Sequence, residues 1–154
     1  TTSKELTYES VPDNAPVTAG SVIVDSLQAG PQLLPTLRSE EEAFIRKNVD
    51  GTSTDSIGCQ KPAARSAVGF TPDGYFLILA VSGKGQDPES TGITLEELAD
   101  LMRRLGCRQA LNLDGGSSTT LFLRLANKEN SVGASVCGKQ PETLVKSTVL
   151  LFPQ

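Results

Sequence analysis

Short apolar runs along the chain are separated by polar segments rich in turn-forming residues. This pattern predicts a β-sheet with a few helices. Apolar or β-branched runs predict strands at residues 21–25, 65–70, 75–81, 110–113, 120–125 and 144–152. A Thr-Pro-Asp-Gly sequence at residues 71–74 predicts a hairpin turn between two of these strands. Residues 75–113, read as strand, helix and strand, have the shape of a βαβ unit.

Two segments carry the signals of helix ends. Residues 39–47 begin with Ser39 and Glu42 spaced as a capping box and end with two basic residues, which predicts a short helix. Residues 94–105 begin with a Thr-x-x-Glu box and repeat leucine on one face, and Gly106 supplies a stop. The second segment therefore predicts an amphipathic helix whose apolar face is core.

The remaining segments predict loops around one folded unit. Residues 1–20 are polar and turn-rich, and residues 48–63 are rich in Gly, Ser and Thr, which predicts a long surface loop. We expect residues 1–154 to form a single domain of the α/β or α+β class. Its mixed β-sheet would be flanked by a few helices.

Length and charge agree with one globular domain. The chain has 154 residues, with 14 Lys and Arg against 18 Asp and Glu, for a formal charge of −4. A nucleic-acid-binding domain would show an excess of basic residues, so we expect no nucleic-acid partner. The longest apolar run, residues 75–81, is too short to cross a bilayer, and we expect no transmembrane segment.

The sequence contains no histidine, which restricts its chemistry. Ser-His-Asp catalysis, Cys-His catalysis and His-ligated zinc are excluded, so acid–base steps must use carboxylates, lysine, tyrosine or thiols. The three cysteines lack a CxxC spacing, and we expect neither a metal nor another cofactor. If a disulfide forms, Cys59–Cys137 is the expected pair, and it would indicate an oxidising compartment.

The segment most able to carry chemistry is Leu-Asn-Leu-Asp-Gly-Gly-Ser-Ser-Thr-Thr at residues 111–120. Asp114 follows a buried strand, at the position where sites of parallel sheets open. Gly115 and Gly116 permit positive φ and a close approach of backbone to a ligand. The four hydroxyl residues that follow, with their amides, suit an anion such as phosphate. The pattern alone leaves open a Gly-Gly hairpin with no ligand.

Several motifs occur together in an order that resembles the phosphodiester glycosidase family. They are Leu-Gln-Ala-Gly-Pro at 27–31, Arg-Ser-Ala-Val-Gly-Phe at 65–70, Ser-Gly-Lys at 82–84, Gly-Ile-Thr-Leu at 92–95, and Ala-Leu-Asn-Leu-Asp-Gly-Gly-Ser-Ser-Thr-Thr at 110–120. The Asn-Leu-Asp-Gly-Gly core is the specific part, and the match is strongest over residues 27–125. The resemblance implies a hydrolase that releases an N-acetylglucosamine-like sugar from a sugar-1-phosphodiester of a phosphorylated glycan. It also implies action outside the cytoplasm, on glycoprotein or on envelope polysaccharide such as exopolysaccharide.

The chain departs from this family in one respect that bears on its completeness. Family domains have a further N-terminal half with an Asn-Gly-Gly-Phe-Phe-like motif, and nothing here corresponds to it. The chain therefore resembles the C-terminal part of the domain, which leaves the N-terminal half of the same protein open as a partner.

The resemblance implies two catalytic side chains. Asp114 would steady an oxocarbenium-like transition state or activate water, because a phosphate leaving group needs little general-acid help. The alternative for Asp114 is an aspartate that orients the glycine turn. Arg65 would clamp the phosphate, and its alternative is a solvated arginine at a strand end. Asp87 is a candidate second carboxylate.

The expected substrate-binding residues surround these two. Gly115 and Gly116 would approach the ligand, and the hydroxyl side chains would donate hydrogen bonds to phosphate or sugar. The full set is Asn112, Gly115, Gly116, Ser117, Ser118, Thr119, Lys84 and Ser90. For Lys84 and Ser90 a solvated loop is the alternative.

Two other functions remain open from the sequence. One is a non-catalytic carbohydrate- or phosphosugar-binding module. The other is a serine hydrolase in which Lys84 replaces the missing histidine as base and Ser117 or Ser118 is the nucleophile.

Overall fold

The computed structural model of the chain describes residue 27 and residues 29–123 and 134–151. Its elements are β1 (Gln32–Leu34), β2 (Ile45–Lys47), β3 (Ser53–Asp55), β4 (Arg65–Phe70), β5 (Phe76–Val81), α1 (Leu95–Arg104), β6 (Gln109–Asn112), the 3-10 helix η1 (Gly116–Ser118), β7 (Leu121–Leu123) and β8 (Ala134–Cys137). The strand expected at residues 21–25 and the segment 1–20 lie outside the described residues. The described part is mostly β, with a single α-helix.

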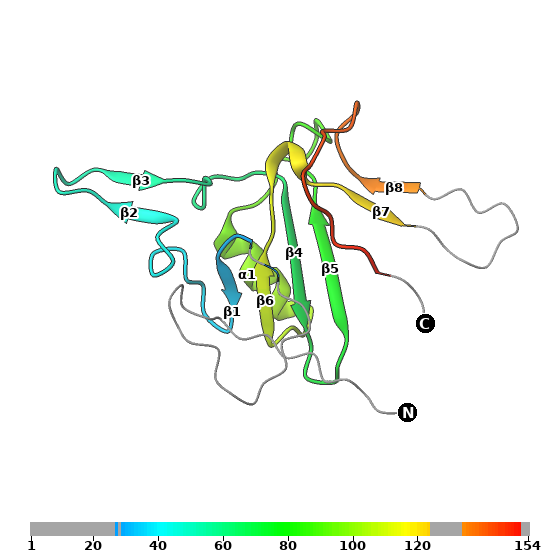
Figure 1. Ribbon diagram of the computed structural model, residues 1–154, viewed down its shortest axis with the longest axis horizontal. Helices are drawn as coiled ribbons and strands as arrows, with labels where there is room; N and C mark the ends of the chain where they lie inside the picture. Colours follow the sequence, from blue (N-terminus) through cyan, green and yellow to red (C-terminus); the bar gives the residue numbers. More distant parts are fainter. Residues whose placement is uncertain (1–26, 28, 124–133, 152–154) are drawn as a thin grey trace, which may run out of the picture.

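The central sheet has the strand order β1-β6-β4-β5 (Figure 1). Every neighbouring pair in it is antiparallel, so the expectation of a mixed sheet is wrong for the described residues. The hairpin turn at residues 71–74 folds β5 directly back onto β4, with the Thr71 amide donating to the Tyr75 carbonyl at 3.0 Å. Strands β5 and β6 therefore run in the same direction but have β4 between them, and the expected βαβ unit is split by that strand.

Helix α1 covers one face of this sheet (Figure 1). The predicted capping box is confirmed: the Thr94 hydroxyl accepts from the Glu97 amide, and the Glu97 carboxylate accepts from the Thr94 amide. Gly106, with φ of +88°, ends the helix as predicted. The core between helix and sheet consists of apolar side chains, including Leu33, Ala67, Leu95, Leu98, Met102 and Ala110. Burying these groups supplies the main force that holds α1 on the sheet.

The helix predicted at residues 39–47 is absent, and this expectation is wrong. The segment forms turns that lead into β2. Strand β2 pairs antiparallel with β3, which lies within residues 48–63, the segment expected to be a loop. Ala43 takes a positive φ of +62°, which ends any helical turn. The Glu42 carboxylate was expected to cap a helix that starts at Ser39. It accepts a hydrogen bond from the backbone amide of Gln32 at 3.2 Å instead. A contact distant in sequence therefore overrides a local helix signal.

The C-terminal part also differs from expectation. Of the strand expected at residues 120–125, residues 121–123 form β7, which pairs with β8, and residues 124–125 lie outside the described residues. The last expected strand is absent over residues 144–151, where the segment pairs with no strand of the described part of the chain. Its apolar side chains are accordingly exposed, Leu144 by 98%.

All three cysteines are buried and none forms a disulfide, so the expected Cys59–Cys137 bond is not formed. Across the described ranges, no helix combines the length and the apolar character that crossing a membrane requires.

Candidate active site at the end of the central sheet

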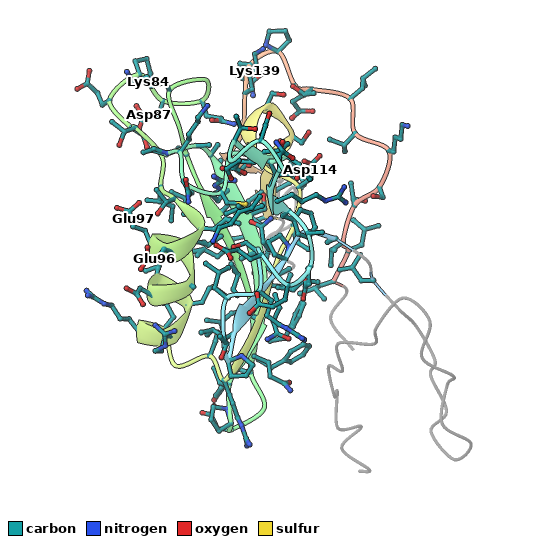
Figure 2. All side chains as sticks on the ribbon, turned by 90° about the vertical axis from the view of Figure 1, so that its left-hand side faces the viewer. Lys84, Asp87, Glu96, Glu97, Asp114 and Lys139 are labelled. Carbon is teal, nitrogen blue, oxygen red and sulfur yellow. The ribbon has the colours of Figure 1, made fainter. Side chains whose placement is uncertain are left out.

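The antiparallel order of the sheet brings three strand ends together. The register pairs Arg65 with Val81 and Ala67 with Asn112. The start of β4 and the ends of β5 and β6 therefore lie at the same end of the sheet, where η1 and the loop after β5 are also found (Figure 1). Figure 2 shows Asp114 at this end, with Lys84 and Asp87 on the loop. The sheet thus brings the segments that carry the expected site residues to one end.

The Asp114 turn continues alongside β4 after β6 has ended. The Leu113 amide donates to the Ser66 carbonyl, and the Gly116 amide donates to the Ala64 carbonyl, each at 2.8 Å. Between these bonds, a Cβ atom on Gly115 would lie 2.9 Å from the Ala64 oxygen. Glycine at position 115 is therefore required by the close approach of two backbones.

Asp114 itself is exposed. Its Oδ1 accepts a hydrogen bond from the Gly115 amide at 2.8 Å. Within the described residues its Oδ2 has no donor, so the carboxylate both orders the turn and presents one oxygen to solvent. The catalytic and the turn-orienting interpretations of Asp114 are thus compatible in one side chain.

The hydroxyl-rich segment after Gly116 forms η1. Within it the Ser118 amide donates to the Gly115 carbonyl and the Thr119 amide to the Gly116 carbonyl, each at 3.2 Å. In the part of the chain described, this leaves the Ser117 amide and the hydroxyls of Ser117 and Ser118 without acceptors. Three donor groups therefore stand beside Asp114 for a ligand.

Two buried polar atoms bracket this segment. Asn112 is 3% exposed and its Nδ2 donates to the Leu113 carbonyl at 2.7 Å, while its Oδ1 has no partner among the described residues. Thr119 is fully buried, and its Oγ1 likewise lacks one. Leaving a buried polar atom unpaired costs about 1–3 kcal/mol. Such costs are commonly retained where the atom serves a ligand or an ordered water.

Arg65 is 3% exposed and is not a solvated strand-end residue. Its Nε donates to the Ile93 carbonyl at 3.1 Å and its Nη1 to the Ile57 carbonyl at 3.3 Å. Its Nη2 donates to the carbonyls of Gly58 at 2.6 Å and Lys61 at 2.9 Å. These bonds occupy four of the five guanidinium N–H groups. One N–H on Nη1 is left, whereas a bidentate clamp on phosphate uses two N–H groups. The clamp therefore stays a prediction, and this packing would restrict it.

The charge of Arg65 lies in a partly compensated environment. No carboxylate of the described residues lies within ion-pair distance of its guanidinium. Burial lowers the pKa of Arg65, an effect that the nearby Cys59 and Asp55 oppose. A Cβ built on Gly115 would lie 4.0 Å from Nη1 of Arg65. The buried cation therefore lies directly behind the backbone of the Asp114 turn.

The loop of residues 82–92 packs against the same β4 extension. A Cβ on Gly83 would lie 2.7 Å from the Ala64 nitrogen, and one on Gly92 would lie 2.3 Å from the Ala63 carbonyl. Lys84 is exposed in this loop. The Ser90 hydroxyl donates to the Ser82 carbonyl at 2.6 Å, so it closes the base of the loop and has an internal acceptor.

Asp87 is exposed and uses its Oδ1 to accept from the Glu89 amide at 3.0 Å.

Sequence reasoning missed three residues of this end. Ala64 supports both the loop and the turn, although its type gives no signal of that role. Gln86 donates from Nε2 to the Gly116 carbonyl at 2.7 Å, and its position two residues after the Ser-Gly-Lys motif was the available signal. Lys139 is an exposed cation at the same end (Figure 2).

The described residues contain no group of three or more Cys, Asp or Glu side chains placed to hold a metal ion. The polar groups collected here are instead hydroxyls, one amide, a carboxylate and cations. Such a set suits a ligand that combines sugar hydroxyls with an anionic group.

A sequence model of one family, described as phosphodiester glycosidase, matches residues 4–152. The chain belongs to this family. Two relatives are named N-acetylglucosamine-1-phosphodiester alpha-N-acetylglucosaminidase. The Mus musculus protein is 31% identical over 85 residues, 55% of this chain and 16% of that protein. The Bos taurus protein is 39% identical over 61 residues, 40% of this chain and 11% of that protein.

The matched part of this phosphodiester glycosidase chain thus spans less than a fifth of these relatives' length. A solved structure from Synechocystis, titled a hypothetical protein, is 36% identical, with a TM-score of 0.37. The match covers 47% of this chain and 13% of that one.

Proposed function

We propose that this phosphodiester glycosidase chain acts in the hydrolysis of a sugar-1-phosphodiester. Water attacks the anomeric carbon, the bond from that carbon to the phosphate oxygen breaks, and the glycan keeps the phosphate as a monoester anion. The sugar released is N-acetylglucosamine or a close analogue. The family membership and the names of the two mammalian relatives support this substrate class.

In this proposal Asp114 is the catalytic carboxylate. Its solvent-facing Oδ2 accepts the proton of the attacking water or stabilises the positive charge that develops on the sugar ring. Its Oδ1 stays bonded to the Gly115 amide, which fixes the orientation of the carboxylate. The phosphate leaves as an anion, so the absence of histidine is no obstacle.

The phosphate is bound by groups that follow Asp114. The Ser117 amide and the Ser117 and Ser118 hydroxyls donate to its oxygens, and Lys84 and Lys139 supply positive charge from the loops at this end of the sheet (Figure 2). Arg65 acts from behind the turn, where its buried charge favours a nearby anion. Asn112 Oδ1 and Thr119 Oγ1 are buried, so in this proposal they bind an ordered water beneath the turn and not the sugar directly.

The observation that carries the proposal is the exposed Asp114 carboxylate on a turn bonded to β4, next to donor groups without acceptors among the described residues. The test is release of N-acetylglucosamine from a synthetic alkyl N-acetylglucosamine-1-phosphodiester. We expect Asp114→Asn to lower kcat by at least about a hundredfold, as loss of a catalytic carboxylate does. Glu96→Gln, on the exposed side of α1, is the matched control. Equal rates for wild type and Asp114→Asn would reject the proposal.

A non-catalytic phosphosugar-binding module is the second candidate. The bond from the Gly115 amide to Asp114 favours it, since a carboxylate of this kind also occurs as a purely structural turn residue. This function predicts that calorimetry detects binding of N-acetylglucosamine-1-phosphate without turnover of the diester. It also predicts that Asp114→Asn weakens binding only by disturbing the turn that Asp114 orients, and not by removing a contact with the ligand.

We further propose that the protein acts outside the cytoplasm, on glycans of the envelope or on exopolysaccharide. The support is the chemistry of the proposed substrate alone, because the Cys59–Cys137 disulfide that would have indicated an oxidising compartment is not formed. Fractionation of cells that express the full natural polypeptide tests this, and recovery in the cytoplasm alone would contradict it.

A further inference from the structure

A single side chain joins the Lys84 loop to the Asp114 turn. The Gln86 carboxamide donates from Nε2 to the Gly116 carbonyl at 2.7 Å, and its Oε1 accepts from the Gly83 amide at 3.1 Å. In the portion of the chain that the structure describes, no other hydrogen bond connects residues 82–92 with residues 113–120. The relative placement of the two segments therefore depends on this carboxamide and on packing against Ala64.

The acceptor of this bond is a sensitive point of the turn. Gly116 has a φ of +59°, and a Cβ built on it would meet no atom within 4 Å, so side-chain packing does not fix its peptide. Its carbonyl also accepts from the Thr119 amide at 3.2 Å, which closes η1. Gln86 thus holds the carbonyl on which the first turn after Asp114 is built.

The chemistry requires an amide at position 86. One carboxamide both donates to the Gly116 carbonyl and accepts from the Gly83 amide, whereas an ionised carboxylate accepts only. A glutamate at this position would keep the bond to Gly83 and lose the bond to Gly116. The two halves of the link can therefore be separated by substitution.

We propose that Gln86 is a positioning residue that holds the Asp114 turn in register with the Lys84 loop. Its kinetic consequence rests on the function proposed above, in which Asp114 acts on the sugar and Lys84 on the phosphate. Because both polar atoms of the Gln86 side chain are engaged with the backbone of Gly83 and Gly116, we assign it to placing other groups and not to binding the substrate. Loss of the link should therefore lower kcat more than it changes KM.

The test compares Gln86→Met, which removes both bonds at nearly constant size, with Gln86→Glu, which removes only the bond to Gly116. Glu89→Ala, a surface change in the same loop, is the control. Hydrogen exchange of peptides covering residues 114–119 should quicken by about fivefold in both Gln86 variants, the effect of one lost hydrogen bond. It should not change in the control. Unchanged exchange in Gln86→Met would overturn the proposal.

Kinetics on the N-acetylglucosamine-1-phosphodiester add the readout that a merely structural residue would not give. We expect kcat to fall by about tenfold in both Gln86 variants, with KM within about twofold of wild type. A normal kcat together with faster exchange would overturn the positioning role. If wild type and Asp114→Asn are both inactive, the proposed function fails by itself, and the exchange result decides whether Gln86 holds the turn.

Discussion

The Gly116 amide donates to the Ala64 carbonyl at 2.8 Å, one residue before the buried Arg65. This bond extends the β4–β6 pairing past the end of β6 and carries the Asp114 turn along the start of β4. The same Ala64 packs against Gly83 from the loop after β5. One small residue at a strand end therefore sets the positions of both segments that carry the proposed site.

The two glycines of the turn should respond differently to substitution. Gly115→Ala would place a Cβ 2.9 Å from the Ala64 oxygen and push the turn off β4, because backbone cannot yield as a flexible side chain can. Gly116→Ala meets open space and only has to adopt a positive φ, at a cost of about 1–2 kcal/mol. We expect Gly115→Ala to lower diester hydrolysis strongly and Gly116→Asn, a residue that tolerates this conformation, to retain most of it. Steady-state assays measure this, and equal losses would contradict the proposed close approach.

Arg65 should behave as a stabilising residue. Replacement by methionine leaves the Ile57 and Lys61 carbonyls without the donor that now satisfies them, and it removes two further bonds. We expect the free energy of unfolding to fall by about 3 kcal/mol, the sum of several small losses. Urea denaturation measures the change.

Arg65→Lys separates this structural role from a phosphate clamp. Lysine keeps the charge but cannot reach four carbonyls in a planar fork, so we expect it to lose most of the same stability. A lysine variant of normal stability that binds N-acetylglucosamine-1-phosphate weakly would instead favour the clamp.

Cys59 gives the protein a defined pH dependence. Burial, then a hydrogen bond with the Asp55 carboxylate and its negative charge, raises the pKa of this thiol from 9.0 to about 11. The folded state therefore keeps a proton that the unfolded state loses as pH rises above 9. The contribution to stability is complete below pH 9 and declines toward pH 11. Urea denaturation of wild type and Cys59→Ala at intervals between pH 8 and pH 11 should show their difference shrinking, and a constant difference would refute the assignment.

Local signals in the sequence were sufficient for elements whose partners lie nearby. The Thr94 capping box and Gly106 mark the two ends of α1, and the turn at residues 71–74 joins β4 to β5. Both were predictable because caps and turns are determined within a few residues. The helix expected at residues 39–47 was wrong because Glu42 bonds to Gln32, a contact that no local pattern encodes.

The same limit applies to the site. Asp114 and its glycines were recognisable from one segment and a family resemblance. The burial of Arg65 depends on carbonyls of three residues of a preceding loop and of Ile93, which only the folded chain brings together. The support from Ala64 is a backbone contact for which residue type carries no signal, and the Gln86 carboxamide binds backbone groups that only the folded chain brings within its reach. The sequence pattern therefore predicts which groups carry chemistry better than it predicts which groups position them.

Thr119 offers a test that separates stability from function. Its Oγ1 is buried and has no partner among the described residues, an arrangement that costs free energy unless a water or a ligand pairs with the hydroxyl. Valine has nearly the same shape without that cost, and Thr119→Val should raise the free energy of unfolding by about 1 kcal/mol. If the hydroxyl binds an ordered water of the site, the same variant should bind N-acetylglucosamine-1-phosphate more weakly. Paired denaturation and calorimetry measure both effects. Reduced stability would show that the hydroxyl is already satisfied in the folded protein, and a gain in stability with unchanged binding would remove Thr119 from the site.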